Sequence, residues 1–449
     1  MKEKFVWQQE LPVRAEADVY VAGGGPAGVA AAVMAAREGA KVFLAEGTGC
    51  LGGMGTAGLI PAFMQFADGV NFLAGGFGRE LYDTLFQRGG MSPDENKNPD
   101  RDPKKHCTIN PEILKRIYDD MALDAGVTLS LFTQLIGVKV EAGRVTHAVC
   151  AAKSGLFAVG AKFFIDATGD GDLAARAGAD FEKGDAEGNM MPGTLCSQWA
   201  NIDWPTAHAS KLYSQQMIAE GIRQGIVKTN DPHLPGIWRT GQTTGGGNVG
   251  HTFGVDATDE RSLTASVIEG RRMLDQYREF YQKIMKGYER MELVNTAPLL
   301  GIRESRRITC DYQMTGEDFY KRATFDDEIG RYAYPADMHA AKPGAAHFDA
   351  FWKSYQGSYY KAGESYGIPY RSLTPKGLDN VYVTGRCVDC DRVMLSSLRV
   401  MPGSFITGQA AGVAAAMAAK NNIATTRGLD VSALQNRLKA LGAFLPNCK

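Results

Sequence analysis

Hydrophobic residues near the start of the chain follow the spacing of a buried strand and then that of a helix. Residues 18–22 (DVYVA) form a short apolar strand pattern, which runs into a glycine-rich turn and then an alanine-rich stretch at 29–38. A second strand pattern, KVFLA, follows at 41–45. Strand, glycine turn, helix and strand in this order are typical of a βαβ unit with parallel strands. The beginning of the chain therefore predicts an α/β fold.

The segments after residue 110 predict further helices and strands. Residues 110–125 have helical periodicity, and strand patterns follow at 127–140, 144–152 and 161–165, as expected for a small antiparallel unit and one more strand. The middle of the chain is richer in Trp, Tyr and Met, and residues 259–288 have the pattern of a long amphipathic helix.

The end of the chain returns to the style of its start, with a strand, VYVTG, and a helix of small residues at 404–420. We therefore expect a Rossmann-like domain in three layers, with a parallel sheet plus a small antiparallel sheet, interrupted by an inserted α+β cap or substrate domain. The expected boundaries are 1–184 for the first part of the nucleotide domain, 185–372 for the cap and 373–449 for the second part.

Composition narrows the class of protein further. Of 449 residues, 44% are hydrophobic and 22% are charged, and 49 basic against 50 acidic side chains leave a net charge of -1. These values exclude a disordered chain, collagen and a membrane-embedded bundle, and they give no overall field that would attract nucleic acid or an anionic membrane. Eight scattered cysteines form no disulfide framework, and the polar N-terminus lacks a secretory signal pattern. We expect a cytoplasmic protein with no nucleic-acid or membrane partner.

The glycine turn carries the first chemical signal. Gly23, Gly25 and Gly28 match a dinucleotide fingerprint in the sequence GGGPAG, and Glu46 ends the second strand at about the expected 20-residue distance. In such a turn, backbone N–H groups and the positive end of the helix meet a pyrophosphate, and the acid accepts hydrogen bonds from ribose. A turn that serves only helix–strand packing is the alternative, but it does not account for Glu46.

The same glycine formula occurs once more, at 245–250 (GGGNVG). No apolar strand pattern precedes it and no alanine-rich helix pattern follows, so we interpret it as a flexible loop. The sequence thus offers no second nucleotide site for an electron partner.

Five stretches resemble FAD-dependent oxidoreductases related to the fumarate reductase and succinate dehydrogenase flavoproteins. They are VAGGGPAGVAAAVMAAREGAKVFLAE at 21–46, the CLGGMGTAG that follows it, IDATGDGDLA at 165–174, GIRESRRI at 301–308, and the segment from GLDNVYVTGRC to RVMPGSFITGQAAGVAAA. The resemblance spans nearly the whole chain, and GIRESRRI with YPADMH at 334–339 looks like a mark of a narrower branch. It implies FAD as the cofactor and a cap that closes over its isoalloxazine ring.

The resemblance also implies which residues lie near FAD. The ATG turn at 167–169 would pass close to the nucleotide, Gly385 and Arg386 would lie beside the ribityl chain and pyrophosphate, and the helix beginning at 401–404 would point its N-terminus at the flavin. Because no histidine precedes His106, where some relatives attach the flavin covalently, we expect noncovalent FAD. The expected cofactor residues are Gly23, Gly25, Pro26, Ala27, Gly28, Glu46, Gly52, Gly53, Met54, Ala167, Thr168, Gly169, Gly385, Arg386, Gly403 and Ser404.

Candidate catalytic residues are cationic or can transfer a proton. Arginine suits a carboxylate or an enolate-like charge, and a histidine two residues after an aspartate could act as a base that the aspartate orients. The resemblance places Arg399 near the flavin, and Arg392 stands where many relatives carry a histidine. Structural Arg–Glu pairs and a structural histidine are the alternatives. The candidates are Arg303, Arg306, His339, Arg392 and Arg399, with His251 as a weaker one.

Cys387 and Cys390 form a CxxC pair, which leaves open a dithiol that exchanges electrons with FAD. Buried free thiols are the favoured interpretation. Because no second CxxC is present, we expect no metal site. The resemblance and these residues together indicate an enzyme that transfers a hydride between flavin N5 and a small organic substrate, for which the arginines suggest a carboxylate or an enone. The alternatives are a thiol–disulfide reductase acting through Cys387 and Cys390, and a non-catalytic binding protein with FAD as a scaffold.

Overall fold

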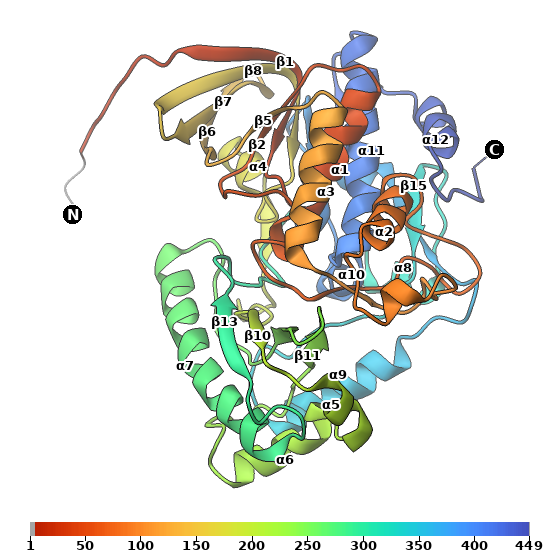
Figure 1. The fold of residues 1–449 in the computed structure, drawn as a ribbon. Helices are drawn as coiled ribbons and strands as arrows, with labels where there is room; N and C mark the ends of the chain where they lie inside the picture. The colour runs from red at the N-terminus through yellow and green to blue at the C-terminus, as the bar shows by residue number, and fades with distance from the viewer. Residues whose placement is uncertain (1–4, 449) are drawn as a thin grey trace.

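The largest element of the structure is a seven-stranded sheet in the upper body of the molecule (Figure 1). The computed structural model describes residues 5–448, so the first four residues and Lys449 of the expected nucleotide domain lie outside it. The strand order is β5-β2-β1-β8-β7-β6, with β17 paired to β8. Pairing is parallel among β5, β2, β1, β8 and β17 and antiparallel along β8-β7-β6. The strands are β1 (Val13–Ala22), β2 (Val42–Ala45), β5 (Thr128–Ser130), β6 (Gln134–Glu141), β7 (Arg144–Ala152), β8 (Gly155–Asp166) and β17 (Val381–Val383).

Alternation along β1 explains the layers on the two sides of this sheet. Val19 and Val21 point to one face and pack in a cluster with the helices, whereas Tyr20 points to the other face and packs with residues of β7 and β8. The result is a layer of helices, the parallel sheet and the antiparallel strands β6 and β7, which is the three-layer Rossmann-like architecture expected from the sequence. The helices of this body are α1 (Pro26–Arg37), α2 (Phe77–Gln87), α3 (Pro111–Asp124), α4 (Asp172–Arg176), α8 (Gly316–Lys321), α10 (Arg392–Leu398), α11 (Met401–Lys420) and α12 (Val431–Ala440).

Helices α1 and α11 pack against each other more closely than ordinary side chains would permit. A Cβ at Gly408 would lie 2.2 Å from the carbonyl oxygen of Ala27, and one at Gly412 would lie 2.2 Å from that of Ala31. Glycine is therefore required at both positions, because any side chain there would push α11 away from α1. Two segments from opposite ends of the chain are joined in this way.

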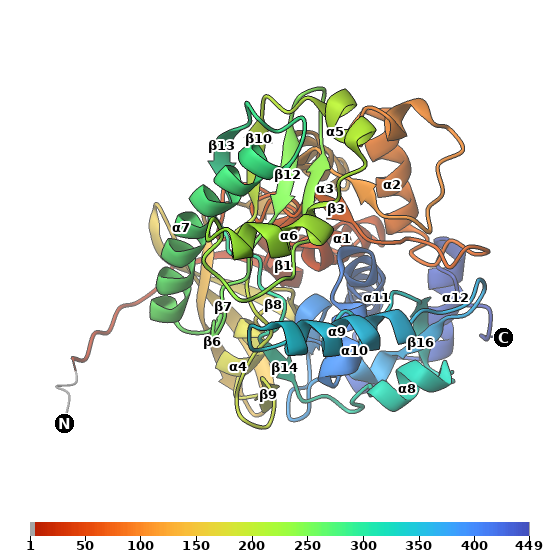
Figure 2. The ribbon, with the colours of Figure 1, turned by 90° about the horizontal axis from the view of Figure 1, so that it is seen from below.

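A second body lies below the first in Figure 1 and is built on a four-stranded antiparallel sheet of order β11-β12-β10-β13. It has its own hydrophobic cluster, in which Trp199 of the sheet packs with Phe280 and Tyr281 of the long helix α7. Figure 2 shows α6, α7 and α9 along its outer side. Its elements are β10 (Ser197–Ala200), α5 (Trp204–Ser210), α6 (Ser214–Arg223), β11 (Gly236–Arg239), β12 (Gly245–Asn248), α7 (Glu260–Ile284), β13 (Glu292–Thr296) and α9 (Ala345–Gly357).

Three two-stranded sheets complete the fold. Strands β15 and β16 pack beside α11, so Tyr332 and Tyr366 belong to the hydrophobic cluster of the upper body. The expected boundaries of the inserted domain stay a prediction. The paired strands are β3 (Ala62–Phe63) with β4 (Cys107–Thr108), β9 (Phe181–Lys183) with β14 (Arg306–Ile308), and β15 (Glu328–Tyr332) with β16 (Tyr366–Pro369).

The second glycine motif is not a loop, as the sequence had led us to expect. Residues 245–248 form β12, which lies inside the four-stranded sheet between β11 and β10. Glycine is needed there because a Cβ at Gly245 or Gly247 would lie 2.5 Å from Ile237 or 2.7 Å from Trp199. The described residues between β12 and α7 form no helix, so the motif has no helix N-terminus that could receive a phosphate.

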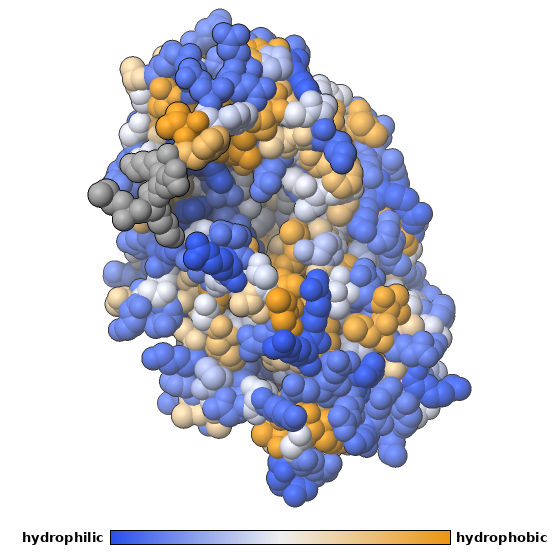
Figure 3. Space-filling view, turned by 90° about the vertical axis from the view of Figure 1, so that its left-hand side faces the viewer, coloured by the Kyte–Doolittle hydropathy of each residue, from blue (hydrophilic) through white to orange (hydrophobic). Residues whose placement is uncertain are grey.

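The molecular surface carries no large apolar face in the view of Figure 3, where hydrophobic side chains lie in small groups among hydrophilic ones. Among residues 5–448, no helix combines the length and the apolar composition needed to cross a bilayer.

Candidate active site

A cavity of about 1190 Å³ extends from the glycine turn after β1 to the sheet and helices of the second body. It exceeds the roughly 300–1,000 Å³ of pockets that hold drug-sized ligands. Gly25 and Glu46 of the upper body and Val267 of α7 are among its lining residues. The cavity is therefore large enough for a dinucleotide together with a small substrate.

The glycine turn is tied to the acid at the end of β2. The backbone N–H of Gly24 donates to Oε2 of Glu46 across 2.6 Å, and that of Thr48 donates to Oε1 across 2.7 Å. Gly23 has a φ of +90°, and a Cβ there would lie 2.7 Å from the carbonyl oxygen of Ala167. Only glycine fits this close approach between the turn and the end of β8.

The next glycine leaves a space that a ligand could fill. A Cβ at Gly25 would meet no protein atom within 4 Å, although Gly25 lines the cavity. Gly25 is also the N-cap of α1, and no side chain caps this helix. Its first N–H groups and the positive end of its dipole therefore remain for an anion at the cavity wall.

The opposite side of the cradle offers further polar groups. Thr168 and Gly169 follow β8, and Gly385 and Arg386 follow β17. Arg386 pairs with Asp170 at 2.9 Å, and its Nη1 is buried with no protein partner. Helix α11 begins beside Arg386 without a side-chain cap. A pyrophosphate and an electron-rich ring would satisfy these donors, so the residues present fit FAD.

Most of the expected cofactor residues line this cavity. Gly28, Gly52 and Gly403 do not line it and instead permit close backbone packing beside it: Gly28 against Gly23, Gly52 against Thr56 and Gly403 against Leu398. The lining members are Gly23, Gly25, Pro26, Ala27, Glu46, Gly53, Met54, Ala167, Thr168, Gly169, Gly385, Arg386 and Ser404.

Two of the candidate arginines lie at the cavity wall. Nη1 of Arg303 donates to the carbonyl oxygen of Pro192 at 2.8 Å and to Oγ1 of Thr194 at 2.9 Å. Among the described residues, no carboxylate forms an ion pair with Arg303, although the side chain is buried. Burial, with Arg399 nearby adding to it, lowers the pKa of Arg303 to about 10, so the guanidinium keeps its charge at neutral pH. Arg399 donates to the carbonyl oxygen and to Oδ2 of Asp337 at 3.0 and 3.2 Å.

The other two candidate arginines lie outside the cavity lining. Segment 301–305 is not a strand; β14 begins at Arg306. Arg306 donates to Oδ1 of Asp172 at 2.9 Å, and Nε of Arg392 donates to Oε1 of Glu304 at 2.9 Å. Both contacts are ion pairs of the kind considered as the structural alternative, and direct roles for these two arginines in the reaction stay predictions.

Two histidines from distant segments, His233 and His339, meet at the cavity. His339 lies in the irregular segment after β15, and its Nε2 is 3.2 Å from Oδ1 of Asp337, as the Asp-x-His spacing led us to expect. The ring of His233 stacks on that of His339 with centroids 4.7 Å apart. Both line the cavity, as does His106. His233 is not among the candidates from the sequence, because nothing in the sequence relates positions 233 and 339.

Cys387 and Cys390 are buried free thiols. Sγ of Cys387 donates to the carbonyl oxygen of Thr384 at 3.3 Å, and Sγ of Cys390 donates to that of Val388 at 3.6 Å. Burial raises both thiol pKa values well above their usual range, which suppresses the reactive thiolate. Neither residue lines the cavity.

The Rossmann-like sheet, the glycine turn bonded to Glu46 and the large cavity together are typical of a protein that binds a dinucleotide. A comparison with protein families identifies the group more closely. The chain belongs to the FAD-dependent oxidoreductase family, whose model matches residues 18–438. The protein is thus an oxidoreductase that uses FAD.

Comparison with solved structures finds distant relatives. A geranylgeranyl bacteriochlorophyll reductase-like protein from Thermoplasma acidophilum is 13% identical, with a TM-score of 0.48, over 96% of this chain and 84% of that one. The p-nitrophenol 4-monooxygenase of Pseudomonas putida is 11% identical, with a TM-score of 0.48, over 95% and 84%. A myxobacterial chondrochloren halogenase is 14% identical, with a TM-score of 0.43, over 95% and 78%. The search of curated proteins found no match.

Proposed function

We propose that the enzyme oxidises or reduces a small organic molecule that carries a carboxylate or an enolate-forming carbonyl. The observation that carries this proposal is Arg303, a buried guanidinium that forms no ion pair with any carboxylate of residues 5–448, in the same cavity as the FAD cradle. A buried charge that no protein group pairs is costly, and an anionic ligand would remove that cost. FAD, when bound, supplies the capacity to accept or return two electrons as a hydride.

The protein's own groups would bind and orient the substrate. Arg303 faces the cavity with a charge held by two neutral oxygen acceptors, so its attraction for an anion is not neutralised in advance. Arg399 is fixed by two contacts to Asp337, which restricts its side chain before a substrate arrives. Both cations would stabilise negative charge that develops on a substrate oxygen in the transition state more than they stabilise the delocalised charge of the bound substrate.

We further propose that the enzyme is related to the fumarate reductase and succinate dehydrogenase flavoproteins, on the sequence motifs alone, and that FAD is held without a covalent bond. Arg392 replaces a histidine of many of those relatives and is engaged with Glu304, so we assign it no proton transfer. Precipitation with acid tests the mode of attachment. Flavin that stays with the denatured protein would contradict noncovalent binding.

Anaerobic mixing of the FAD-loaded enzyme with candidate substrates tests the function. Small carboxylates, 2-hydroxy acids and enones should bleach the flavin absorbance band, or restore it after prior reduction. Each carboxylate is paired with its methyl ester, which keeps the reacting carbon and removes the charge. Esters that react as well as the acids would refute an anionic substrate.

A further inference from the structure

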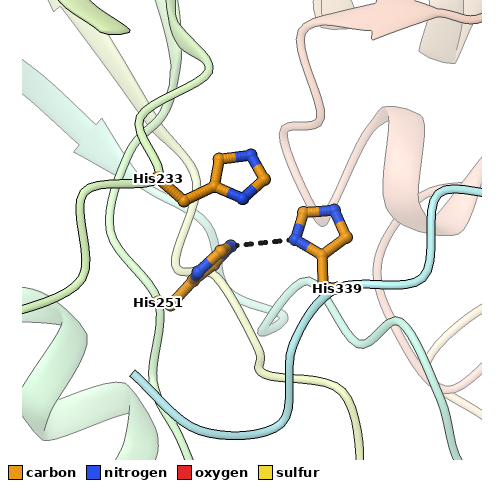
Figure 4. A group of neighbouring side chains, drawn as sticks. All are labelled: His233, His251 and His339. Carbon is orange, nitrogen blue, oxygen red and sulfur yellow. Dashed lines mark hydrogen bonds between the residues drawn. The ribbon is translucent and has the colours of Figure 1, made fainter. Parts of the chain in front are cut away.

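Three buried or half-buried imidazoles form a cluster at the junction of the second body and the segment after β15. Figure 4 shows His233, His251 and His339 turned toward one another, with a hydrogen bond drawn between two of them. One nitrogen of each ring lies within 4.8 Å of one nitrogen of the others. His233 and His339 line the FAD cavity, whereas His251 lies behind them, against a separate pocket.

The first step concerns His251. Its Nδ1 is 2.8 Å from Oδ2 of Asp231, and both side chains are buried. Oδ1 of the same carboxylate accepts the backbone N–H of His233 at 3.2 Å. An ionised carboxylate only accepts hydrogen bonds, so Nδ1 of His251 must be the donor. A neutral His251 then carries no proton on Nε2.

The second step concerns His339. Its Nδ1 lies 3.2 Å from Nε2 of His251. Since Nε2 of His251 accepts, Nδ1 of His339 donates, and a neutral His339 is left with a bare Nε2. Burial, with the positive charge of Arg303 adding to it, holds the pKa of His339 well below its usual range, in agreement with a neutral ring. The chain Asp231, His251, His339 thus fixes one tautomer.

We propose that Asp231 and His251 are positioning residues that hold His339 neutral and protonated at Nδ1, so that its Nε2 exchanges a proton with the substrate. This inference rests on the proposed function. In an oxidation, Nε2 of His339 would accept the proton of a substrate O–H or N–H. The hydrogen of the adjacent C–H bond would leave with both bonding electrons as a hydride, and FAD, when bound, would supply the capacity to accept it. Reduction reverses both transfers. Oδ1 of Asp337 lies 3.2 Å from Nε2 without forming a hydrogen bond with it, unlike Asp231 with Nδ1 of His251, so it does not fix a proton on Nε2. Its negative charge stabilises the imidazolium that forms.

The ring geometry and the charges around the cluster favour proton transfer over metal binding. Parallel rings of His233 and His339, 5° apart in plane, do not direct their lone pairs to one point, because each lone pair lies in its own ring plane. Arg303 and Arg399 would also repel a divalent cation. The charged or titratable groups that face His339 are His233, His251, Arg303, Asp337 and Arg399.

Nuclear magnetic resonance of the full-length, FAD-loaded protein with ¹⁵N-labelled histidine tests this without a substrate. Long-range ¹H–¹⁵N correlations report which ring nitrogen carries the proton, and His339→Gln identifies the signals of His339 by their loss. We expect Nδ1 protonated and Nε2 bare in the native protein. Asp231→Asn and His251→Gln should shift His339 toward the other tautomer, whereas Asp337→Asn should not.

The opposite pattern overturns the proposal: Nε2 of His339 protonated in the native protein, or a tautomer that follows Asp337 instead of Asp231. Zinc that copurifies in a one-to-one ratio and is lost in His251→Gln would also overturn it, in favour of a metal site. Once a substrate is known, Asp231→Asn should lower kcat roughly 10- to 100-fold with little change in KM, and Asp231→Glu should restore part of it. Because the tautomer needs no turnover, it stands even if the proposed substrate class fails.

Discussion

The backbone N–H of Gly24 and Oε2 of Glu46 are joined by a 2.6 Å hydrogen bond that connects the glycine turn to the end of β2. The same carboxylate holds the N–H of Thr48, so one side chain fixes both loops that border the cradle. A carboxylate has about four acceptor positions, which leaves capacity for a ribose hydroxyl.

Glu46→Gln should therefore weaken FAD binding. The amide NH₂ would face a backbone N–H, and the loops would lose a charged acceptor, at a cost of about 1–3 kcal/mol or roughly 10- to 100-fold in Kd. Calorimetry on protein stripped of FAD measures this change. Glu10→Gln, on an exposed side chain, is the control. Equal affinities for FAD in the two variants would show that Glu46 does not contribute to FAD binding.

Gly25→Ala should affect FAD binding, whereas Gly23→Ala should affect the stability of the fold. The added methyl at position 25 meets no protein atom, so the melting temperature of the FAD-free protein should hardly change, while FAD affinity falls. At position 23, a φ of +90° and a 2.7 Å contact to the carbonyl oxygen of Ala167 should lower the melting temperature itself. Thermal scans with and without FAD distinguish the two. Normal FAD affinity in Gly25→Ala would show that the cofactor does not approach this turn.

Arg399→Ala should lower kcat/KM by about 100-fold or more with FAD affinity unchanged, because the arginine faces the substrate region and is held there by Asp337. Arg371→Ala removes another arginine that pairs with an aspartate, on an exposed surface, and is the matched control. Arg306→Ala is tested in the same way, together with a thermal scan. Because Arg306 forms an ion pair with Asp172, we expect this variant to have a lower melting temperature. A parallel loss of FAD binding and turnover in Arg399→Ala would indicate a structural arginine.

Acidification should destabilise the protein through its buried histidines. Burial lowers the pKa of His233, His251 and His339 in the folded state, so below about pH 6.5 the unfolded chain binds more protons than the native one. Stability should fall as the pH drops from 6.5 toward the folded-state values, by up to about 1.4 kcal/mol per pH unit for each histidine. Melting temperatures between pH 7.5 and 5.5 give the slope. His339→Gln should flatten it, and His208→Gln, on an exposed side chain, should not.

The two thiols of the CxxC pair should not react with thiol reagents in the native enzyme. Because Cys387 and Cys390 are buried and their thiol pKa values are raised, a thiol reagent should label them only after unfolding. The double variant Cys387→Ser, Cys390→Ser should keep its turnover with the substrate. Loss of flavin reoxidation or reduction in that variant would support a dithiol that exchanges electrons with FAD.

The sequence predicted the parts of the fold that depend on local spacing. The turn from Gly23 to Gly28, the acid at Glu46 and the helix expected over 110–125, which spans Pro111–Asp124, follow from short-range patterns. Strand β12 was missed because glycine has low strand propensity. It forms through its pairing with β10 and β11, and Trp199 and Ile237 leave room there only for glycine. Packing overrode propensity at that position.

The proton-transfer cluster could not be predicted, for a different reason. Asp231, His251 and His339 are spread over more than 100 residues, and only the packing of the second body against the segment after β15 brings them together. His233, His251 and His339 have no short spacing in the sequence, so a cluster of these histidines leaves no signal there. Arg303 and Arg306 differ by three positions, yet only one lines the cavity.

The close contact of α1 with α11 has a consequence for the growing polypeptide. The apolar side of the first βαβ unit is covered by a helix that ends at Lys420, and β17 joins the sheet only at 381–383. During synthesis, the ribosome must therefore translate the chain as far as residue 420 before α11 can cover the first βαβ unit. Until then the apolar surface of α1 stays exposed, and chaperones can bind such a surface and prevent aggregation.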